Sequence, residues 1–173
     1  MSSRTTSAEL LQRVLDDLLR ARAHARFSHD RVRGLDPNPT SWTPEEAERV
    51  EAFTARVARV VDLLTNTVLR ALFRYELEPE GSALDRVHLA EKRGFVDHAE
   101  DLRVLKEQRN VIAHDYAGTS LGHVFRYCLD HLTELDTICT RVTEYAERRL
   151  ADAHTPSVDQ SVNGMKETDR SPK

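Results

Sequence analysis

Apolar side chains recur every three or four residues along most of this chain, which is the spacing that forms one face of an α-helix. The first such stretch covers residues 7–33 and ends at Gly34. Its apolar positions are Leu10, Leu11, Val14, Leu15, Leu18 and Leu19. Charged residues occupy the opposite face, so we predict an amphipathic helix that packs against a core.

A loop and a second helix follow. Residues 34–43 contain two prolines together with turn-forming Asp and Asn, and we expect Trp42 to anchor this loop. Thr43 is placed as a helix cap, a proline occupies the first helical position, and Glu46 completes a capping box. The apolar spacing then continues to Tyr75, which predicts one long helix of about nine turns.

Two further helix starts are marked by capping residues. Ser82 is positioned to cap a short helix over residues 83–93, and Gly94 is positioned to end it. Asp97 is followed three residues later by Glu100, a spacing that resembles a capping box. We therefore predict that the fourth helix begins with Asp97 as its cap.

The last predicted helix covers residues 120–151 and contains both cysteines, Cys128 and Cys139. Eleven residues of helix separate them by roughly 16 Å, which is too far for a disulfide. We expect two reduced thiols buried as small apolar side chains. The sequence after this helix lacks periodicity, so we predict a helical domain over residues 1–152 and a disordered tail over residues 153–173.

Five predicted helices without a strand pattern indicate an all-α fold. The expected architecture is an up-and-down bundle of four long or medium helices plus a short one. A length of 173 residues suits one domain, and the presence of only six glycines and six prolines argues against a turn-rich β-protein.

Composition also restricts the environment and the chemistry. No apolar run approaches the roughly 18 residues of a membrane span, and the N-terminus has no apolar signal core, so we expect a cytoplasmic protein without membrane attachment. The eight histidines form no HExxH or Glu-x-x-His pattern, and no CxxC pair is present. We expect neither a metal nor a cofactor.

Charge is distributed unevenly along the chain. The whole sequence carries −4, but residues 1–33 contain seven arginines against four acidic residues. A protein that coats nucleic acid needs many cationic contacts, so any RNA contact should be local. Arg20, Arg22 and Arg26 are weak candidates for it, although cations near a helix C-terminus also compensate the helix dipole.

The strongest candidate for chemistry is the eight-residue stretch RNVIAHDY, which contains Arg109, Asn110, His114 and Tyr116. It combines a phosphate-binding guanidinium with an imidazole that transfers protons near neutral pH. On a helix, Asn110 and His114 share one face, and Arg109 and Tyr116 share another, roughly 140° away. Convergence therefore requires a helix break near Gly118 or a second chain. The alternative is a structural role, in which Arg109 and His114 compensate the helix dipole and Tyr116 closes the core.

Written RxxxxHxY, with Asn directly after the Arg, this stretch resembles the signature of the HEPN superfamily. The likeness is to HepT-like toxins and to the HEPN partners of minimal nucleotidyltransferases. It covers residues 7–150, but only the motif is specific. The resemblance implies a homodimeric helical bundle whose site is built from both chains. In HepT-like toxins it also implies that a nucleotidyltransferase antitoxin adenylylates the motif tyrosine, which is Tyr116 here.

Metal-independent RNA cleavage fits these side chains, because the ribose 2′-hydroxyl can attack the adjacent phosphate once a base accepts its proton. His114 would act as acid or base, Arg109 would hold the phosphate, and Asn110 would support them. We predict a toxin with this endoribonuclease activity. The alternative is a noncatalytic substrate-binding subunit of a minimal nucleotidyltransferase, in which Arg109 and His114 bind the partner or a nucleotide.

Overall fold

A computed structural model describes residues 2–79, 81–114 and 121–152, and of residues 2–5, 108, 109 and 111–114 it describes the backbone alone. Within the described residues the chain is helical throughout its regular structure, with no strand. In chain order the elements are α1 (Ser2–Val32), η1 (Pro39–Ser41), α2 (Pro44–Asp62), η2 (Leu63–Val68), α3 (Leu69–Tyr75), α4 (Ala83–Lys92), α5 (Ala99–His114) and α6 (Leu121–Asp152).

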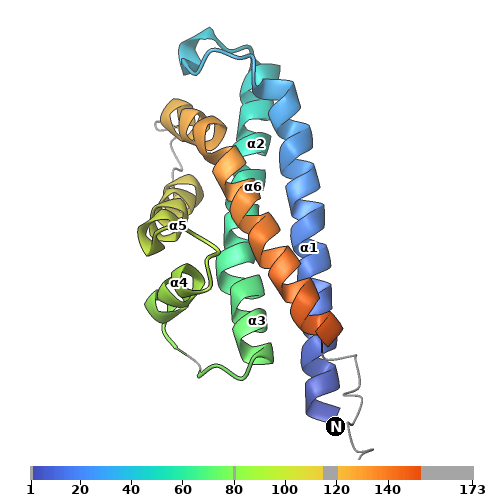
Figure 1. Cartoon of the computed structure of the whole chain (residues 1–173). Helices are drawn as coiled ribbons and strands as arrows, with labels where there is room; N and C mark the ends of the chain where they lie inside the picture. Colours follow the sequence, from blue (N-terminus) through green and yellow to red (C-terminus); the bar gives the residue numbers. More distant parts are fainter. Residues whose placement is uncertain (1, 80, 115–120, 153–173) are drawn as a thin grey trace, which may run out of the picture.

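The helices form an up-and-down bundle, as predicted. In Figure 1, α1 runs up the molecule and the continuous helical run α2–η2–α3 returns beside it. The third leg is divided into two short helices, α4 and α5, which lie along the other side of that run. Helix α6 crosses diagonally and packs against α1, α2 and α5. The all-α bundle is therefore confirmed within the described chain.

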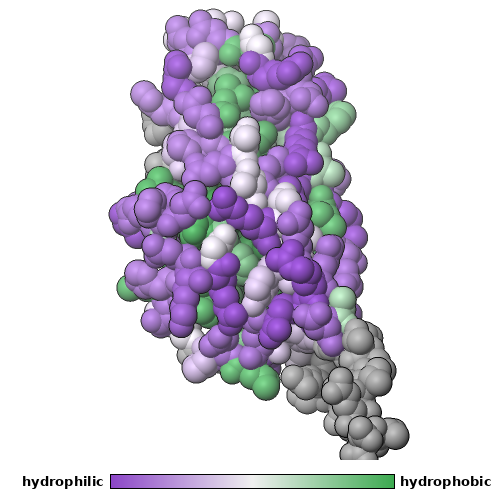
Figure 2. All heavy atoms as spheres, viewed as in Figure 1, coloured by the Kyte–Doolittle hydropathy of each residue, from purple (hydrophilic) through white to green (hydrophobic). Residues whose placement is uncertain are grey.

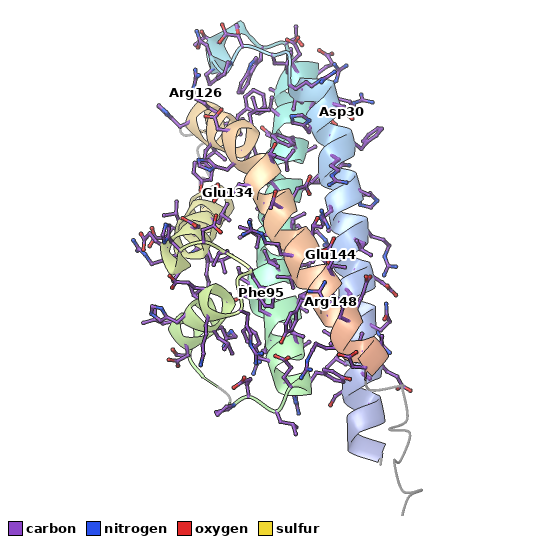
Figure 3. All side chains as sticks on the ribbon, in the orientation of Figure 1. Asp30, Phe95, Arg126, Glu134, Glu144 and Arg148 are labelled. Carbon is purple, nitrogen blue, oxygen red and sulfur yellow. The ribbon has the colours of Figure 1, made fainter. Side chains whose placement is uncertain are left out.

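Hydrophobic residues of all long helices meet in one core, and polar residues cover the outside. Figure 2 shows hydrophilic residues over most of the face drawn, with hydrophobic ones in small patches. Figure 3 shows the corresponding side chains, and the labelled α6 residues Arg126, Glu134 and Glu144 are exposed while Phe95 is buried. This separation is what an amphipathic helix in a bundle requires.

Trp42 anchors the loop between α1 and α2, as expected from the sequence. Its indole Nε1 donates a 2.6 Å hydrogen bond to the backbone carbonyl of Asp36. Its ring packs edge-on against Phe125 of α6, and Phe125 packs edge-on against Phe53 of α2. The ring contact attaches the loop to the core, and the indole N–H bond closes the loop on itself.

The predicted start of α2 is correct. Thr43 Oγ1 accepts from the backbone N–H of Glu46, and the Glu46 carboxylate accepts from the backbone N–H of Thr43, at 3.2 and 2.8 Å. Both halves of the capping box are present. The first four N–H groups of a helix lack intrahelical partners. The capping box gives hydrogen-bond acceptors to the N–H groups of Thr43 and Glu46.

The predicted long helix is continuous up to Tyr75, and its segment η2 is π-helical. The N–H of Leu69 bonds the carbonyl of Leu64, five residues back. This wider turn inserts one residue, so the adjacent Val68 and Leu69 are both buried. Beyond the insertion, α3 packs against α1 and α4.

The short helix α4 begins and ends as predicted. Ser82 and Asp85 form a complete capping box, and Gly94 takes the left-handed conformation with φ +72°. A left-handed residue directly after a helix favours glycine, because a β-carbon there is strained.

The predicted cap of α5 was wrong by one residue. His98 occupies the cap position, where its backbone N–H donates to Asp101 Oδ2 at 3.1 Å. Asp97 instead accepts from Arg141 of α6 at 3.1 Å. Phe95 and Val96, which lie between α4 and this cap, are buried in the core.

A buried ionic cluster joins the ends of α3, α4 and α6. The Glu76 side chain is only 2 % exposed, and its Oε1 accepts from the Tyr145 hydroxyl at 2.7 Å and from Arg149 Nε at 2.9 Å. Arg93 Nη2 lies 3.1 Å from Glu76 Oε2 without hydrogen-bond geometry, so this contact is an ion pair. Such a carboxylate is stabilised only while its partners stay in place.

Both cysteines are free and buried in α6, as predicted. Burial raises the pKa of the Cys128 thiol and of the Cys139 thiol to about 12. Removal from water disfavours the thiolate, so both groups remain neutral and apolar in the core.

Candidate functional site

Helix α5 carries the first part of the motif in its last two turns. It is continuous from Ala99 to His114, so Arg109, Asn110 and His114 belong to one regular helix. A helix break before His114 is thereby excluded. Tyr116, the expected modification site, lies outside the described residues, as does Gly118.

The helical register divides these positions between two lines along α5. Position 109 continues the line of Leu102 and Leu105, which are buried. Position 114 continues the line of Asn110, four residues earlier. Positions 109 and 114 are five residues apart and are therefore separated by about 140° around the helix axis. One helix does not bring both positions to the same side.

Asn110 is exposed and lines one end of a groove between α4 and α5. The groove has a volume of about 290 Å³, and Leu84, which is 58 % exposed, forms part of its wall. Its lining residues are Ala83, Leu84, Val87 and His88 from α4, and Ala99, Glu100, Arg103, Lys106, Glu107 and Asn110 from α5. The structure thus places one predicted site residue at a concave surface with both apolar and polar walls.

Charges in this groove are only partly paired. Arg103 Nε donates to Glu100 at 2.7 Å, and Arg103 also forms an ion pair with Glu107. This hydrogen bonding lowers the pKa of Glu100, so the carboxylate stays ionised and compensates the positive charge of Arg103. Lys106 is half-buried and has no hydrogen-bond or ion-pair partner among the described residues. Lys106 is therefore the cation that this groove offers to an anionic ligand.

The candidate RNA-binding arginines of α1 have different environments. Arg22 is only 7 % exposed and donates to the Asp136 side chain and carbonyl and to Thr140, at 3.1, 3.0 and 2.8 Å. Arg26, which is exposed, donates to the same Asp136 carboxylate at 2.7 Å. Arg22 therefore holds α1 to α6 and does not present its guanidinium to solvent. Arg20 is exposed and pairs with Asp17 at 2.7 Å.

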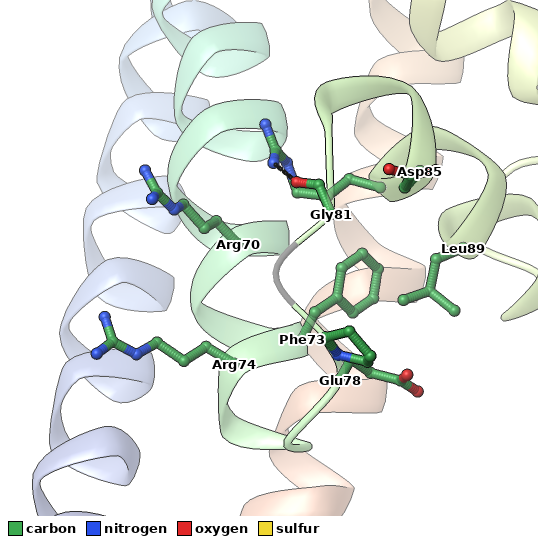
Figure 4. A pocket seen from close by; sticks show the side chains of 9 residues that line it. Arg70, Phe73, Arg74, Glu78, Gly81, Asp85 and Leu89 are labelled. Carbon is green, nitrogen blue, oxygen red and sulfur yellow. Dashed lines mark hydrogen bonds between the residues drawn. The ribbon is translucent and has the colours of Figure 1, made fainter.

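Sequence patterns did not single out a second cavity, between α3 and α4 (Figure 4). It has a volume of about 230 Å³, and its charged lining residues are Arg70 and Arg74 of α3, Glu78, and Asp85 and Arg86 of α4. Arg86 donates a 3.0 Å hydrogen bond to the carbonyl of Gly81. The four-residue spacing of Arg70 and Arg74 was the available signal, because it places both on one helix face. This cavity and the groove lie on different faces of α4.

No group of three or more His, Cys, Asp or Glu residues among the described residues is arranged to hold a metal ion. None of the helices in this part of the chain is long and apolar enough to span a membrane.

Comparison with known proteins adds no assignment. No family model, curated protein or solved structure matched the chain.

Proposed function

We propose that this chain is a HEPN-type, HepT-like toxin, a homodimeric endoribonuclease that cleaves RNA without a metal ion. The observation that carries the proposal is the position of Arg109, Asn110 and His114 in the last two turns of α5, with Asn110 exposed at an open groove. A role in closing the core does not account for the exposed Asn110 side chain at this groove.

The reaction follows from the properties of the three side chains. A base removes the proton of the ribose 2′-hydroxyl, the oxygen attacks the adjacent phosphorus, and the bond from phosphorus to the 5′-oxygen breaks. His114 transfers protons in this step, with an unperturbed pKa near 6.5 for this residue type. Arg109 stabilises the negative charge on the phosphate, and Asn110 donates to it or orients the imidazole. The products are a 2′,3′-cyclic phosphate and a free 5′-hydroxyl.

The helical register is the reason why the proposed site needs a second protomer. Positions 109 and 114 diverge by about 140° on a helix that is unbroken to His114. In the proposal, Arg109 of one protomer and His114 of the other act on the same phosphate. A homodimer formed near the end of α5 supplies both groups twice, once on each side of a two-fold axis.

Control by a partner is the third part of the proposal. A nucleotidyltransferase antitoxin adenylylates Tyr116, and the added AMP blocks the RNA site by its bulk and negative charge. Co-expression with a nucleotidyltransferase from the same genome should increase the mass of the Tyr116 peptide by one AMP. A Tyr116→Phe chain should remain unmodified under the same conditions.

Cleavage by the purified protein tests the catalytic role. Wild-type protein in EDTA should generate RNA fragments with 2′,3′-cyclic phosphate ends, and His114→Ala should be at least about 100-fold slower. His24→Ala is the matched control, because His24 is exposed on α1 outside the motif and should leave the rate unchanged. A wild-type protein that does not cleave RNA and does not arrest growth would falsify the toxin hypothesis. The alternative, a noncatalytic subunit of a nucleotidyltransferase, would then remain.

Mixed dimers test whether the site is shared between chains. Co-expressed Arg109→Ala and His114→Ala chains form heterodimers that contain one site with both groups intact. The mixture should regain part of the wild-type rate although each variant alone is inactive. A mixture as inactive as its components would show that each chain builds its own site.

A further inference from the structure

A third cavity, between α1 and α2, combines an exposed aromatic ring with several arginines. It has a volume of about 360 Å³. Phe27, Ser28 and Arg31 of α1 line it together with Glu45, Glu48, Arg49, Ala52 and Arg56 of α2. We call these eight residues the Phe27 surface. All of them are fully described, and they lie on elements other than the α4 and α5 that form the groove at Asn110.

Phe27 is only partly buried by the fold. Its side chain is 59 % exposed although it lies within α1, where neighbouring Ala25 and Ser28 are buried. A phenyl ring that is mostly exposed gains only part of the stabilisation that full burial provides. The guanidinium of Arg31 lies 5.5 Å from the ring centroid, which is a cation–π contact. Phe27 therefore offers a flat aromatic platform with a cation beside it.

Two arginines of this surface can bind a ligand, and the third is hydrogen-bonded to the protein. Among the described residues, Arg49 has no hydrogen-bond or ion-pair partner, and Arg31 contacts only the Phe27 ring. Arg56 donates to the hydroxyl of Ser28, which is buried. Ser28 thus fixes one guanidinium on the cavity wall, while Arg31 and Arg49 are left to bind an anion. Bidentate guanidinium donors match the oxygens of a phosphate.

Two carboxylates share the cavity with these arginines. Glu45 and Glu48 are exposed, lie in the first turns of α2 and have no hydrogen-bond or ion-pair partner among the described residues. They repel phosphate and accept hydrogen bonds. The exocyclic amino groups of cytosine, adenine and guanine are donors that suit such acceptors, whereas uracil has no amino group. The same carboxylates disfavour an acidic peptide as the ligand.

We infer that the Phe27 surface binds one or two nucleotides of single-stranded RNA, with a base stacked on Phe27 and phosphate oxygens on Arg31 and Arg49. This inference takes its ligand from the proposed ribonuclease function and adds a binding surface away from the motif. Stacking on an aromatic ring combined with arginine contacts to the backbone is how single strands are held without base pairing. Glu45 and Glu48 give the surface a preference for bases that carry an amino group.

Binding can be measured without cleavage in the His114→Ala chain. Fluorescence anisotropy with labelled single-stranded RNA of about 12 nucleotides reports affinity for oligocytidine and oligouridine separately. Phe27→Ala should weaken oligocytidine binding about tenfold, since stacking contributes most of the contact. Arg49→Gln should reduce the dependence of log affinity on log salt by about one unit. Both effects should be absent in two controls, Leu19→Ala and Arg148→Gln, which alter exposed residues outside the surface.

Base preference tests the role of the carboxylates. Oligocytidine should bind more tightly than oligouridine, and a Glu45→Gln, Glu48→Gln double variant should bind oligouridine better by removing repulsion. Equal affinity for the two oligomers in the starting chain would overturn this assignment, even where stacking on Phe27 persists.

The outcomes separate this surface from the proposed function. RNA cleavage that depends on His114, together with RNA binding unaffected by Phe27→Ala, would overturn the surface and leave the ribonuclease intact. RNA binding that depends on Phe27 in a protein that never cleaves RNA would support the surface and refute the ribonuclease. An acidic peptide that binds this surface while RNA does not would identify a protein ligand and overturn the assignment to RNA.

Discussion

Gly122 of α6 lies directly against the backbone of Pro37 in the loop between α1 and α2. A β-carbon added at Gly122 would be 2.7 Å from the Pro37 carbonyl oxygen and 2.8 Å from the Pro39 ring. The loop therefore rests on the first turn of α6, one turn before the Phe125 ring that receives Trp42. Helix α6 begins at Leu121, seven residues after His114, the last described residue of the motif helix.

Replacing Gly122 by alanine should destabilise the protein by about 1–2 kcal/mol. Alanine is the better helix former by about 0.5–1 kcal/mol, but overpacking against backbone typically costs about 1–3 kcal/mol, so the clash decides the sign. Urea unfolding measures the difference. Gly34→Ala is the matched control, because a β-carbon at Gly34 meets nothing within 4 Å. Equal midpoints for the two variants would contradict the close packing of the loop.

The ion pair between Arg22 and Asp136 should matter far more than the one between Arg20 and Asp17. Asp136→Ala leaves the buried Arg22 guanidinium without its carboxylate, a change that costs on the order of 3 kcal/mol. Asp17→Ala removes a solvent-exposed pair that contributes well under 1 kcal/mol. Thermal or urea unfolding of both variants measures the two losses of stability. Similar losses would mean that Arg22 finds other partners once Asp136 is removed.

Stability should fall in alkaline solution through the two buried cysteines. Their thiol pKa is raised from the ordinary value of 9.0 to about 12, so between these values the unfolded chain loses protons that the folded chain retains. The contribution of the two protonated thiols to the free energy of unfolding is complete below pH 9. It is lost as pH rises toward 12, by up to about 1.4 kcal/mol per pH unit for each thiol.

A Cys128→Ala, Cys139→Ala double variant provides the comparison for this effect. Its unfolding free energy should decline less steeply than that of the wild type between about pH 8.5 and about pH 10. This interval precedes the main titration of Tyr127, whose pKa burial raises from 10.0 to about 12. Parallel pH profiles would show that the thiols titrate alike in both states.

Lys106 should contribute to RNA binding in the groove beside Asn110. Lys106→Gln removes the unpaired cation of this groove, so we expect a several-fold higher KM for RNA cleavage with kcat nearly unchanged. The salt dependence of log affinity should decrease by about one unit. Lys92→Gln, at an exposed position at the end of α4, is the control. A loss confined to kcat would instead assign Lys106 to the chemical step.

Most secondary structure was predictable because its causes are local. The Thr43 and Ser82 caps, the left-handed Gly94 and the buried stripe of α6 each depend on residues within one or two turns. Local hydrogen bonds and apolar spacing appear in the sequence directly. The errors arose where a distant element competes, as at Asp97, which pairs with Arg141 instead of capping α5.

The candidate site shows the same division. The sequence places Arg109, Asn110 and His114 on one helix, and the structure adds the groove that Asn110 lines with Leu84. A groove requires two helices to meet at a particular angle, and no residue spacing within α5 contains that information. The role of Tyr116 lies beyond the described residues and remains a prediction.

By itself the sequence determined that this protein is a helical bundle with an RNVIAHDY motif near the end of its fourth predicted helix. Only the tertiary structure decided which charges serve the fold and which are left for a ligand. Arg22 and Asp136 are separated by 114 residues and meet because α1 packs on α6. Phe27 and Arg49 face a shared cavity because α1 packs on α2. Burial and pairing depend on contacts between distant segments, and a helical pattern specifies a face but not the partner that covers it.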